Sequence, residues 1–305
     1  MKLWVGVTDN DWFEFHRNRK PDEVNFWRPG GSHEFRAIEP GAPFLFKLHS
    51  PQDYIAGGGF LVRHSNLPLF LAWDIFKEKN GCETLDELEK QIHRYRHDNE
   101  RNPVIGCTVL TEPFFWPRDL WIPVPNDWKK NLVQGRCYTT DDAHGRVLWK
   151  AVIERLHGHQ QEYAQDLRVK EPGTDYSVAL RKVRLGQGAF RLLVTESYHR
   201  RCAMTGERTL PVLQAAHIKV YGEGPSIISN GICLRSDLHT LFDRGYVTIA
   251  PDMRIEVSRK IREEYQNGRD YYALHGRNLL VLPDSAADHP AKEFLAWHNT
   301  NIYVA

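Results

Sequence analysis

Four polar residues in the last third of the chain have the types and spacing that metal-assisted chemistry requires. His217 ends an apolar segment, Asn230 lies in the loop that follows, and His239 comes later in a segment with helical spacing. Asp243 follows His239 after one helical turn, so the two side chains share a face of that helix. An imidazole and a carboxylate on one face are donors that suit a divalent cation.

His217 is the candidate base among them. An imidazole with an unperturbed pKa of ~6.5 accepts and releases protons near neutrality. Hydrolysis of a phosphodiester needs a base for water, a cation for the charge that develops at phosphorus, and a group that orients the base. The sequence supplies one of each: His217 as the base, the pair of His239 and Asp243 for the cation, and Asn230 to orient the base. A lone histidine is more often structural, and we expect a structural role for His199, His275 and His298.

The surrounding sequence predicts the elements that must position these residues. Apolar segments at 214–218 and 232–234 are predicted strands, and a loop with Gly, Pro and Ser separates them. A helix is predicted over 236–244, with Ser236 as its N-cap and Gly245 just past its end. A further helix is predicted over 188–198, ahead of the first strand.

This order of motifs resembles the HNH (ββα-metal) endonuclease superfamily, in its bacterial branch with an Ala-Ala-His-Ile signature. The resemblance covers roughly residues 180–300, and its most specific segments are 201–206, 213–218, 229–231 and 234–247. It implies a metal-dependent DNA endonuclease in which His217 is the general base and Asn230 holds its ring. It also implies that His239 is a metal ligand, and Asp243 lies where other members place a second His or Asn ligand.

One position departs from better-known members of that superfamily. The residue before the base, often a metal ligand, is Ala216 here, which leaves His239, Asp243, water and the substrate phosphate to hold the cation. We expect Mg²⁺, with Mn²⁺ as the alternative. The zinc-binding C-x-x-C pairs of many relatives are missing, so no structural zinc is expected and Cys202 and Cys233 are assigned to the core.

The bulk composition describes an ordinary globular chain rather than a membrane or disordered one. Hydrophobic residues make up 41% and charged residues 26%, and no apolar run approaches the ~20 residues that span a bilayer. The N-terminal residues read as a strand rather than a secretory signal. The 5 scattered cysteines indicate no disulfide framework, so we expect a reducing, cytoplasmic setting and no membrane partner.

The net charge of +1 is too small to predict nucleic-acid binding by itself, but positive charge is concentrated between residues 181 and 208. Beside a nuclease site such a run is expected to contact DNA phosphates, although an ordinary solvated face is the alternative. The predicted DNA-binding residues are Arg184, Arg191, Arg200, Arg201 and Arg235.

A chain of 305 residues exceeds what one core usually organises, so two domains are expected. A Pro-Gly pair at 172–173 indicates a linker, and we predict domains at 1–165 and 166–305. In the first domain the sequence predicts short strands at 3–8, 44–48, 58–63, 105–110 and 121–124, and helices at 85–96 and 146–167.

Aromatic residues interleaved with polar ones occur throughout the first 75 residues. Rings that sandwich an extruded base, with polar groups that read its edge, are what a base-flipping pocket requires, although most of these rings must be core. Segments 4–12, 24–27, 40–50 and 54–60 resemble the PUA-like superfamily with its EVE and ASCH domains, with Ala42 in place of an acid. The resemblance implies a small β-barrel that reads a modified base. The predicted pocket residues are Asp11, Trp12, Asn25, Trp27 and His49.

Together these patterns predict an α+β protein in which a PUA/EVE-like β-barrel reader precedes a ββα-metal nuclease domain, similar to modification-dependent restriction endonucleases. The expected partner is double-stranded DNA that carries 5-methyl- or 5-hydroxymethylcytosine. One HNH site cuts one strand, so a double-strand break implies a homodimer or successive nicks. The alternatives are an HNH nuclease that is triggered by a phosphorothioate backbone or plain sequence, a catalytically silent reader, and an RNA-directed protein.

Overall fold

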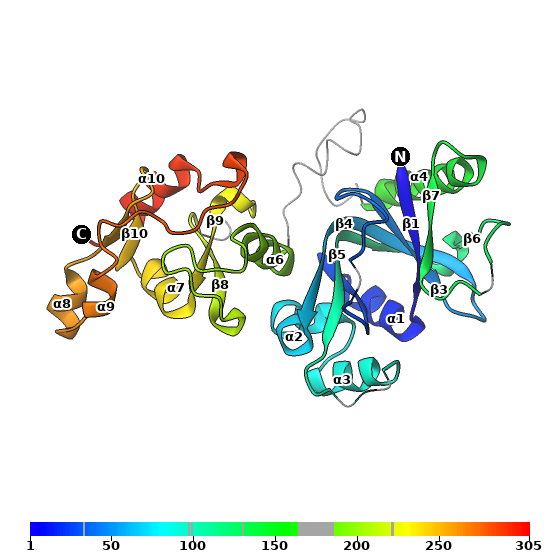
Figure 1. Cartoon of the computed structure of the whole chain (residues 1–305). Helices are drawn as coiled ribbons and strands as arrows, with labels where there is room; N and C mark the ends of the chain where they lie inside the picture. The colour runs from blue at the N-terminus through cyan, green and yellow to red at the C-terminus, as the bar shows by residue number, and fades with distance from the viewer. Residues whose placement is uncertain (33, 97, 99, 130, 164–185, 221–222) are drawn as a thin grey trace. The chain divides into compact units, whose positions relative to one another are not determined.

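The computed structural model describes residues 1–305 except 33, 97, 99, 130, 164–185 and 221–222. The chain divides into two compact units, Met1–Val183 and Arg184–Ala305 (Figure 1). The predicted α+β class is confirmed by the element order. The boundary predicted at 165/166 and the Pro-Gly linker lie outside the described residues.

The first unit is built on a mixed sheet. Its strands are β1 (Lys2–Thr8), β2 (Glu23–Arg28), β3 (Pro43–Leu48), β4 (Tyr54–Pro68), β5 (Val104–Phe115), β6 (Ile122–Pro123) and β7 (Gly135–Thr139). The order is β2-β5-β4-β3-β1-β7, and β6 pairs with β4. Strands β1 and β3 are parallel, and the other pairs are antiparallel.

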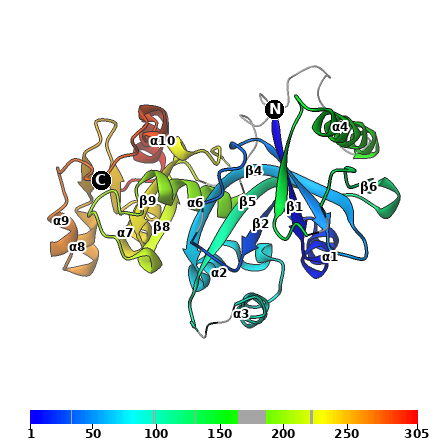
Figure 2. The same ribbon diagram turned by 45° about the vertical axis from the view of Figure 1, so that its right-hand side comes forward.

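The pairings among the described residues leave β2 and β7 as the ends of this sheet. They confirm a mixed sheet, not the closed barrel that the PUA/EVE resemblance implies. Register shifts interrupt the pairing of β4 with β3 and with β5. Such bulges increase local twist and bend a strand, and β4 is visibly curved in Figure 2. The predicted strands are confirmed, while β2 and β7 were not predicted as strands.

Helices cover both faces of this sheet. They are α1 (Asn10–Arg19), α2 (Leu69–Phe76), α3 (Leu85–His93) and α4 (Ala143–Tyr163), with 3-10 turns η1 (Lys77–Asn80) and η2 (Arg118–Leu120). Side chains alternate along β3, so Phe44 and Phe46 pack in one cluster with Trp12 of α1, and Leu45 packs in the other with Leu148 of α4. Burial on both faces explains why β3 is apolar along most of its length.

The second unit is assembled from short elements. They are α6 (Gln187–Ser197), β8 (Leu213–His217), β9 (Gly231–Arg235), α7 (Ser236–Asp243), β10 (Val247–Ile249), β11 (Ile255–Val257), α8 (Lys260–Tyr265), α9 (Arg269–Tyr272) and α10 (Lys292–Asn301). Three 3-10 turns are η4 (Leu210–Val212), η5 (Ile228–Asn230) and η6 (Ala286–Asp288). Antiparallel β8 and β9 lie beside α7 in both views (Figures 1 and 2).

The predicted helices and strands of this unit are confirmed, with one correction at the start of α7. Arg235, not Ser236, is the N-cap, because β9 runs directly into the helix and Ser236 is already helical. Gly245 lies just past the helix end as predicted, with φ of +75°. A Cβ there would lie 2.0 Å from the Ile302 carbonyl oxygen, so the close passage of the C-terminal segment requires glycine.

One apolar cluster forms the core of this unit. It joins Phe190 and Val194 of α6 to Leu238 and Phe242 of α7. Cys202 and Cys233 are fully buried within it, which confirms their assignment to the core. None of the helices in the described part of the chain is both long and apolar enough to cross a membrane.

A buried histidine of α1 generates a prediction about acid stability. His16 is 1% exposed, packs 4.4 Å from the Trp12 ring, and its Nε2 has no hydrogen-bond partner among the described residues. Burial, with the nearby Arg19 charge, lowers the pKa of His16 to about 3. The unfolded chain therefore binds a proton below its pKa of ~6.5 that the folded chain does not, so folding free energy is lost as the pH falls from 6.5 toward 3.

Between pH 7 and pH 5 the wild-type protein should lose about 2 kcal/mol of unfolding free energy through His16, because ~1.4 kcal/mol is lost for each pH unit below the unfolded pKa. We expect His16→Leu to lack this part of the loss. Urea denaturation at the two pH values measures this difference. The exposed His144 provides the matched control, since His144→Leu should keep the full loss. An undiminished loss in His16→Leu would contradict the account.

Candidate functional site

The four candidate residues are brought to one region by a hairpin and the helix that follows it. His217 ends β8 and pairs with Gly231 at the start of β9, so Asn230 lies next to this pair. Helix α7 then carries His239 and Asp243. The predicted succession of strand, loop, strand and helix is therefore confirmed.

The imidazole of His217 lies flat on the ring of Phe190, with centroids 3.8 Å apart and planes 9° from parallel. Its Nε2 is 3.5 Å from Oγ of the buried Ser226. Burial, with a smaller effect of His239, lowers the pKa of His217 to about 4. The ring is therefore neutral at pH 7, which is the protonation state that a general base needs.

Gly231 permits this stacking. A Cβ at that position would lie 2.4 Å from Cγ2 of Val194 and 2.9 Å from Cζ of Phe190. Any other residue there would push α6 away from the hairpin. The absence of a side chain on β9 thus sets the position of the ring beneath the base.

Asn230 is fully buried and fastens the loop that follows the base. Its Oδ1 accepts from the Lys219 N–H at 2.8 Å, and its Nδ2 donates to the carbonyls of Lys219 at 3.0 Å and Pro225 at 2.9 Å. These bonds run to the loop backbone, and the Asn230 carbonyl accepts from the N–H of Ile218, the residue after His217, at 3.0 Å. That Asn230 holds the His217 ring through a backbone or side-chain bond stays a prediction. Because Ser226 follows Pro225, Asn230 positions the hydroxyl that lies beside that ring.

His239 and Asp243 share one face of α7, as predicted. Nε2 of His239 is 3.2 Å from Oδ2 of Asp243, and its Nδ1 is 2.7 Å from Oε1 of Gln214. Burial lowers the pKa of His239 in spite of the opposing effect of Asp243, and the charge of Arg191 lowers it further. Partial burial raises the pKa of the Asp243 carboxyl, although this side chain keeps 57% exposure and so opens to solvent.

These two side chains fit a divalent cation. A carbonyl oxygen only accepts, so Nδ1 of His239 carries a proton, and in the neutral ring Nε2 then presents a lone pair to the Asp243 carboxylate. With the ring neutral and the carboxyl ionised, these are two electron-rich atoms 3.2 Å apart, and a proton or a cation between them stabilises the pair. Two adjacent ligands of one octahedral Mg²⁺, each ~2.1 Å from it, lie about 3 Å apart.

The rest of the coordination falls to water and phosphate oxygens. No group of three or more His, Cys, Asp or Glu side chains suitable for a metal occurs in the part of the chain that the structure describes. Ala216 is fully buried, so its position faces the core. A site with two protein ligands suits Mg²⁺, which keeps several waters and binds substrate phosphates.

The predicted DNA-binding arginines differ in their surroundings. The charge of Arg191 lowers the pKa of His239, one of the two candidate ligands. Arg235 binds Asp237 through Nε at 2.7 Å and Nη2 at 2.8 Å, and Arg200 binds Glu196 at 2.6 Å. Arg201 is half-buried, and Arg184 lies outside the described residues.

Two of the three histidines that the sequence assigned to structural roles, His298 and His275, bond backbone groups, whereas His199 is exposed. His298 is 2% exposed, stacks on Phe242 at 3.8 Å and bonds its carbonyl through Nε2 at 3.1 Å. His275 accepts the Val257 N–H through Nδ1 at 3.0 Å, and His199 pairs with Asp284 at the surface.

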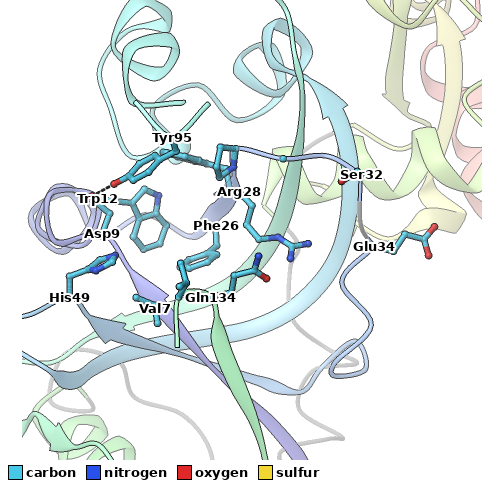
Figure 3. A pocket seen from close by; sticks show the side chains of 14 residues that line it. Val7, Asp9, Trp12, Phe26, Arg28, Ser32, Glu34, His49, Tyr95 and Gln134 are labelled. Carbon is cyan, nitrogen blue, oxygen red and sulfur yellow. Dashed lines mark hydrogen bonds between the residues drawn. The ribbon is translucent and has the colours of Figure 1, made fainter. Parts of the chain in front are cut away.

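The first unit contains a pocket of about 710 Å³ near α1 and β2 (Figure 3). Of the five residues predicted from the sequence, Trp12, Trp27 and His49 line it. Asp11 is exposed in the first turn of α1, and Asn25 is fully buried; neither lines the pocket. Further polar and aromatic residues at the pocket, outside the five predicted pocket residues, are Asp9, Phe26, Arg28, Ser32, Glu34, Tyr95 and Gln134.

Asn25 is connected to the pocket through Asn80, which bonds Trp27. Its Nδ2 donates to Oδ1 of Asn80 at 2.8 Å, and the Asn80 carbonyl accepts from Nε1 of Trp27 at 2.9 Å. Asp9 caps α1 by accepting from the N–H groups of Asp11 and Trp12, which the sequence could have signalled because Asp is a favoured N-cap. Its second oxygen accepts from the Tyr95 hydroxyl at 3.5 Å (Figure 3).

Comparison with solved structures finds similarity to a chain described as a modification dependent TagI restriction endonuclease. The identity is 13% and the TM-score 0.28, over 92% of this chain and 75% of that chain. A TM-score this low establishes no shared fold. No curated protein matches this chain.

A family comparison is specific for one segment of the second unit. Residues 202–250 match the HNH_2 family, described as HNH endonuclease. The matched segment contains the base candidate, the loop-fastening asparagine and both ligand candidates in the geometry described above. Residues 202–250 are therefore an HNH endonuclease domain, the domain of a DNA phosphodiester hydrolase.

Proposed function

We propose that this protein is a modification-dependent DNA endonuclease, in which a PUA/EVE-like first unit captures an extruded modified base and the HNH domain hydrolyses a nearby phosphodiester. The observation that carries the proposal is the pocket of about 710 Å³ in a unit separate from the nuclease domain. Its volume falls within the ~300–1,000 Å³ typical of sites for small organic groups.

The lining of the pocket has the chemistry of base recognition. The half-buried rings of Phe26 and Trp27 offer faces for stacking beside the buried Trp12, and Trp27 is held in place by its bond to Asn80. Arg28 and Gln134 bring polar groups that can read the edge of a base. The proposed substrate is double-stranded DNA with a 5-substituted cytosine, 5-methyl- or 5-hydroxymethylcytosine.

In the nuclease domain, the neutral His217 removes a proton from the attacking water. His239 and Asp243 hold a divalent ion, Mg²⁺ with Mn²⁺ as the alternative, and when bound it supplies positive charge to the phosphate oxygens. Arg191 adds a fixed positive charge near the same place. By similarity to other HNH nucleases the products carry 5′-phosphate and 3′-hydroxyl ends, and a double-strand break requires a homodimer or two successive nicks.

Replacement of the base tests the nuclease assignment. Because general-base catalysis contributes roughly 10²–10⁴-fold, His217→Ala should slow single-turnover cleavage of a modified duplex in Mg²⁺ by about that factor. His199→Ala is the matched control, because His199 is exposed and pairs with Asp284 away from the candidate residues. Cleavage by His217→Ala at the wild-type rate would show that the base is another group.

The low pKa of His217 predicts an unusual acid limit. Since kcat/KM reports the free enzyme, a base with a pKa of about 4 remains neutral at pH 5.5. We therefore expect kcat/KM at pH 5.5 and saturating Mg²⁺ to stay within about twofold of its value at pH 7. An ordinary imidazole with a pKa of ~6.5 would lose about tenfold over this interval, and such a loss would contradict the burial of the base.

The reader pocket is tested by binding with cleavage disabled. In a His217→Ala background, Trp27→Leu should weaken binding of the modified duplex about tenfold or more, since stacking of a base on an aromatic ring contributes ~1–3 kcal/mol. Fluorescence anisotropy with methylated, hydroxymethylated and plain duplexes measures the effect. Trp73→Leu is the control, because Trp73 is half-buried on α2 and does not line the pocket.

Equal affinities of the parent protein for the three duplexes would refute recognition of these modifications. A preference for phosphorothioate DNA or for RNA in the same assay would instead support the corresponding alternative.

A further inference from the structure

We infer that Gln214 is a positioning residue of the nuclease domain, whose side-chain carbonyl selects the tautomer of His239 that can bind a cation. The inference rests on the proposed metal role of His239 and Asp243. It adds a group outside the four residues that the sequence singled out, and it concerns how the metal-free protein is prepared for the ion.

The contact is short and joins the two elements of the site. Oε1 of Gln214 is 2.7 Å from Nδ1 of His239. Gln214 lies on β8, the strand that ends at His217, whereas His239 lies on α7. One hydrogen bond thus connects the strand of the base to the helix of the ligands, with both side chains partly buried.

The chemistry of the amide decides the state of the ring. When the carbonyl oxygen faces Nδ1, that nitrogen carries the proton and Nε2 keeps a lone pair directed at the side of Asp243, 3.2 Å away. If the amide nitrogen faced Nδ1 instead, the proton would move to Nε2 and be donated to the Asp243 carboxylate. That arrangement would satisfy the pair internally and leave no lone pair for a metal.

The observed arrangement matches a general property of metal-bound histidines. Their second ring N–H is donated to a carboxylate or carbonyl oxygen, which fixes tautomer and ring orientation and raises ligand basicity. A carboxylate could replace the amide carbonyl in this role, because it too only accepts. A side chain of similar length without an acceptor could not.

The tautomer is measured directly in the metal-free full-length protein. Long-range ¹H–¹⁵N spectra of ¹⁵N-histidine-labelled protein, with His239→Ala for assignment, should show the His239 ring protonated at Nδ1 near pH 7.5. Gln214→Met should lose this preference, and Gln214→Glu should retain it. A wild-type ring protonated at Nε2 would overturn the inference.

Metal binding provides a second readout that is independent of cleavage. Calorimetric titration with Mn²⁺ should give a Kd that is about 10–100-fold weaker in Gln214→Met, the usual effect of losing such a supporting bond. Gln214→Glu should bind Mn²⁺ within about threefold of wild type or more tightly. This rescue separates positioning from mere packing at residue 214. Gln187→Met, at an exposed position of α6, is the control and should leave the Kd unchanged.

The outcomes distinguish this inference from the proposed metal site. If His239→Ala and Asp243→Asn bind Mn²⁺ as wild type does, the metal site itself is wrong. If those variants lose binding while Gln214→Met retains it, or if Gln214→Glu binds as weakly as Gln214→Met, the positioning role alone is refuted.

Discussion

The proposed metal site of the second unit depends on the packing that holds the His239 imidazole beside the Asp243 carboxylate. Nε2 of His239 and Oδ2 of Asp243 are 3.2 Å apart on adjacent turns of a short helix. Isolated helices of that length are not stable in water, so packing must hold this one. Leu238 and Phe242 are fully buried beneath it, and His298 of α10 bonds the Phe242 carbonyl at its last turn. The core thus keeps the imidazole and the carboxylate together, where a proton or a cation between them stabilises the pair.

The lowered pKa of His217, the proposed base, has two opposite consequences. A low pKa keeps His217 neutral over a wide pH range, but a weakly basic imidazole is also a weak proton acceptor. Catalysis by His217, the proposed base, would rely on placement more than on basicity. The loop beside it is held by Asn230, which bonds both Lys219 and Pro225, and the Ser226 hydroxyl lies 3.5 Å from the ring.

The sequence predicted what local periodicity determines and missed what packing determines. The i,i+4 spacing of His239 and Asp243 was sufficient to place them on one face. The sequence did not indicate a role for Gln214. Gln214 and His217 are three residues apart on β8, and residues three apart on an ideal strand point to opposite faces. The strand pattern alone therefore gave no reason to expect that Gln214 contacts His239 on α7. Asn25 and Asp11 fit the aromatic-polar pattern, yet one faces Asn80 in the interior and the other lies in an exposed helical turn. Barrel closure likewise concerns strands far apart in sequence, whose pairing local patterns do not specify.

Gly231, which has no side chain, affects the direction from which water can approach the proposed base. Because nothing projects from β9 at this position, Phe190 reaches the face of the His217 ring and fixes the plane in which that ring lies. The lone pair of an imidazole nitrogen lies in the ring plane, so a water molecule can hand over its proton only along the ring's edge. The line of approach to the base is therefore set by a helix that contributes no atom to the proton transfer.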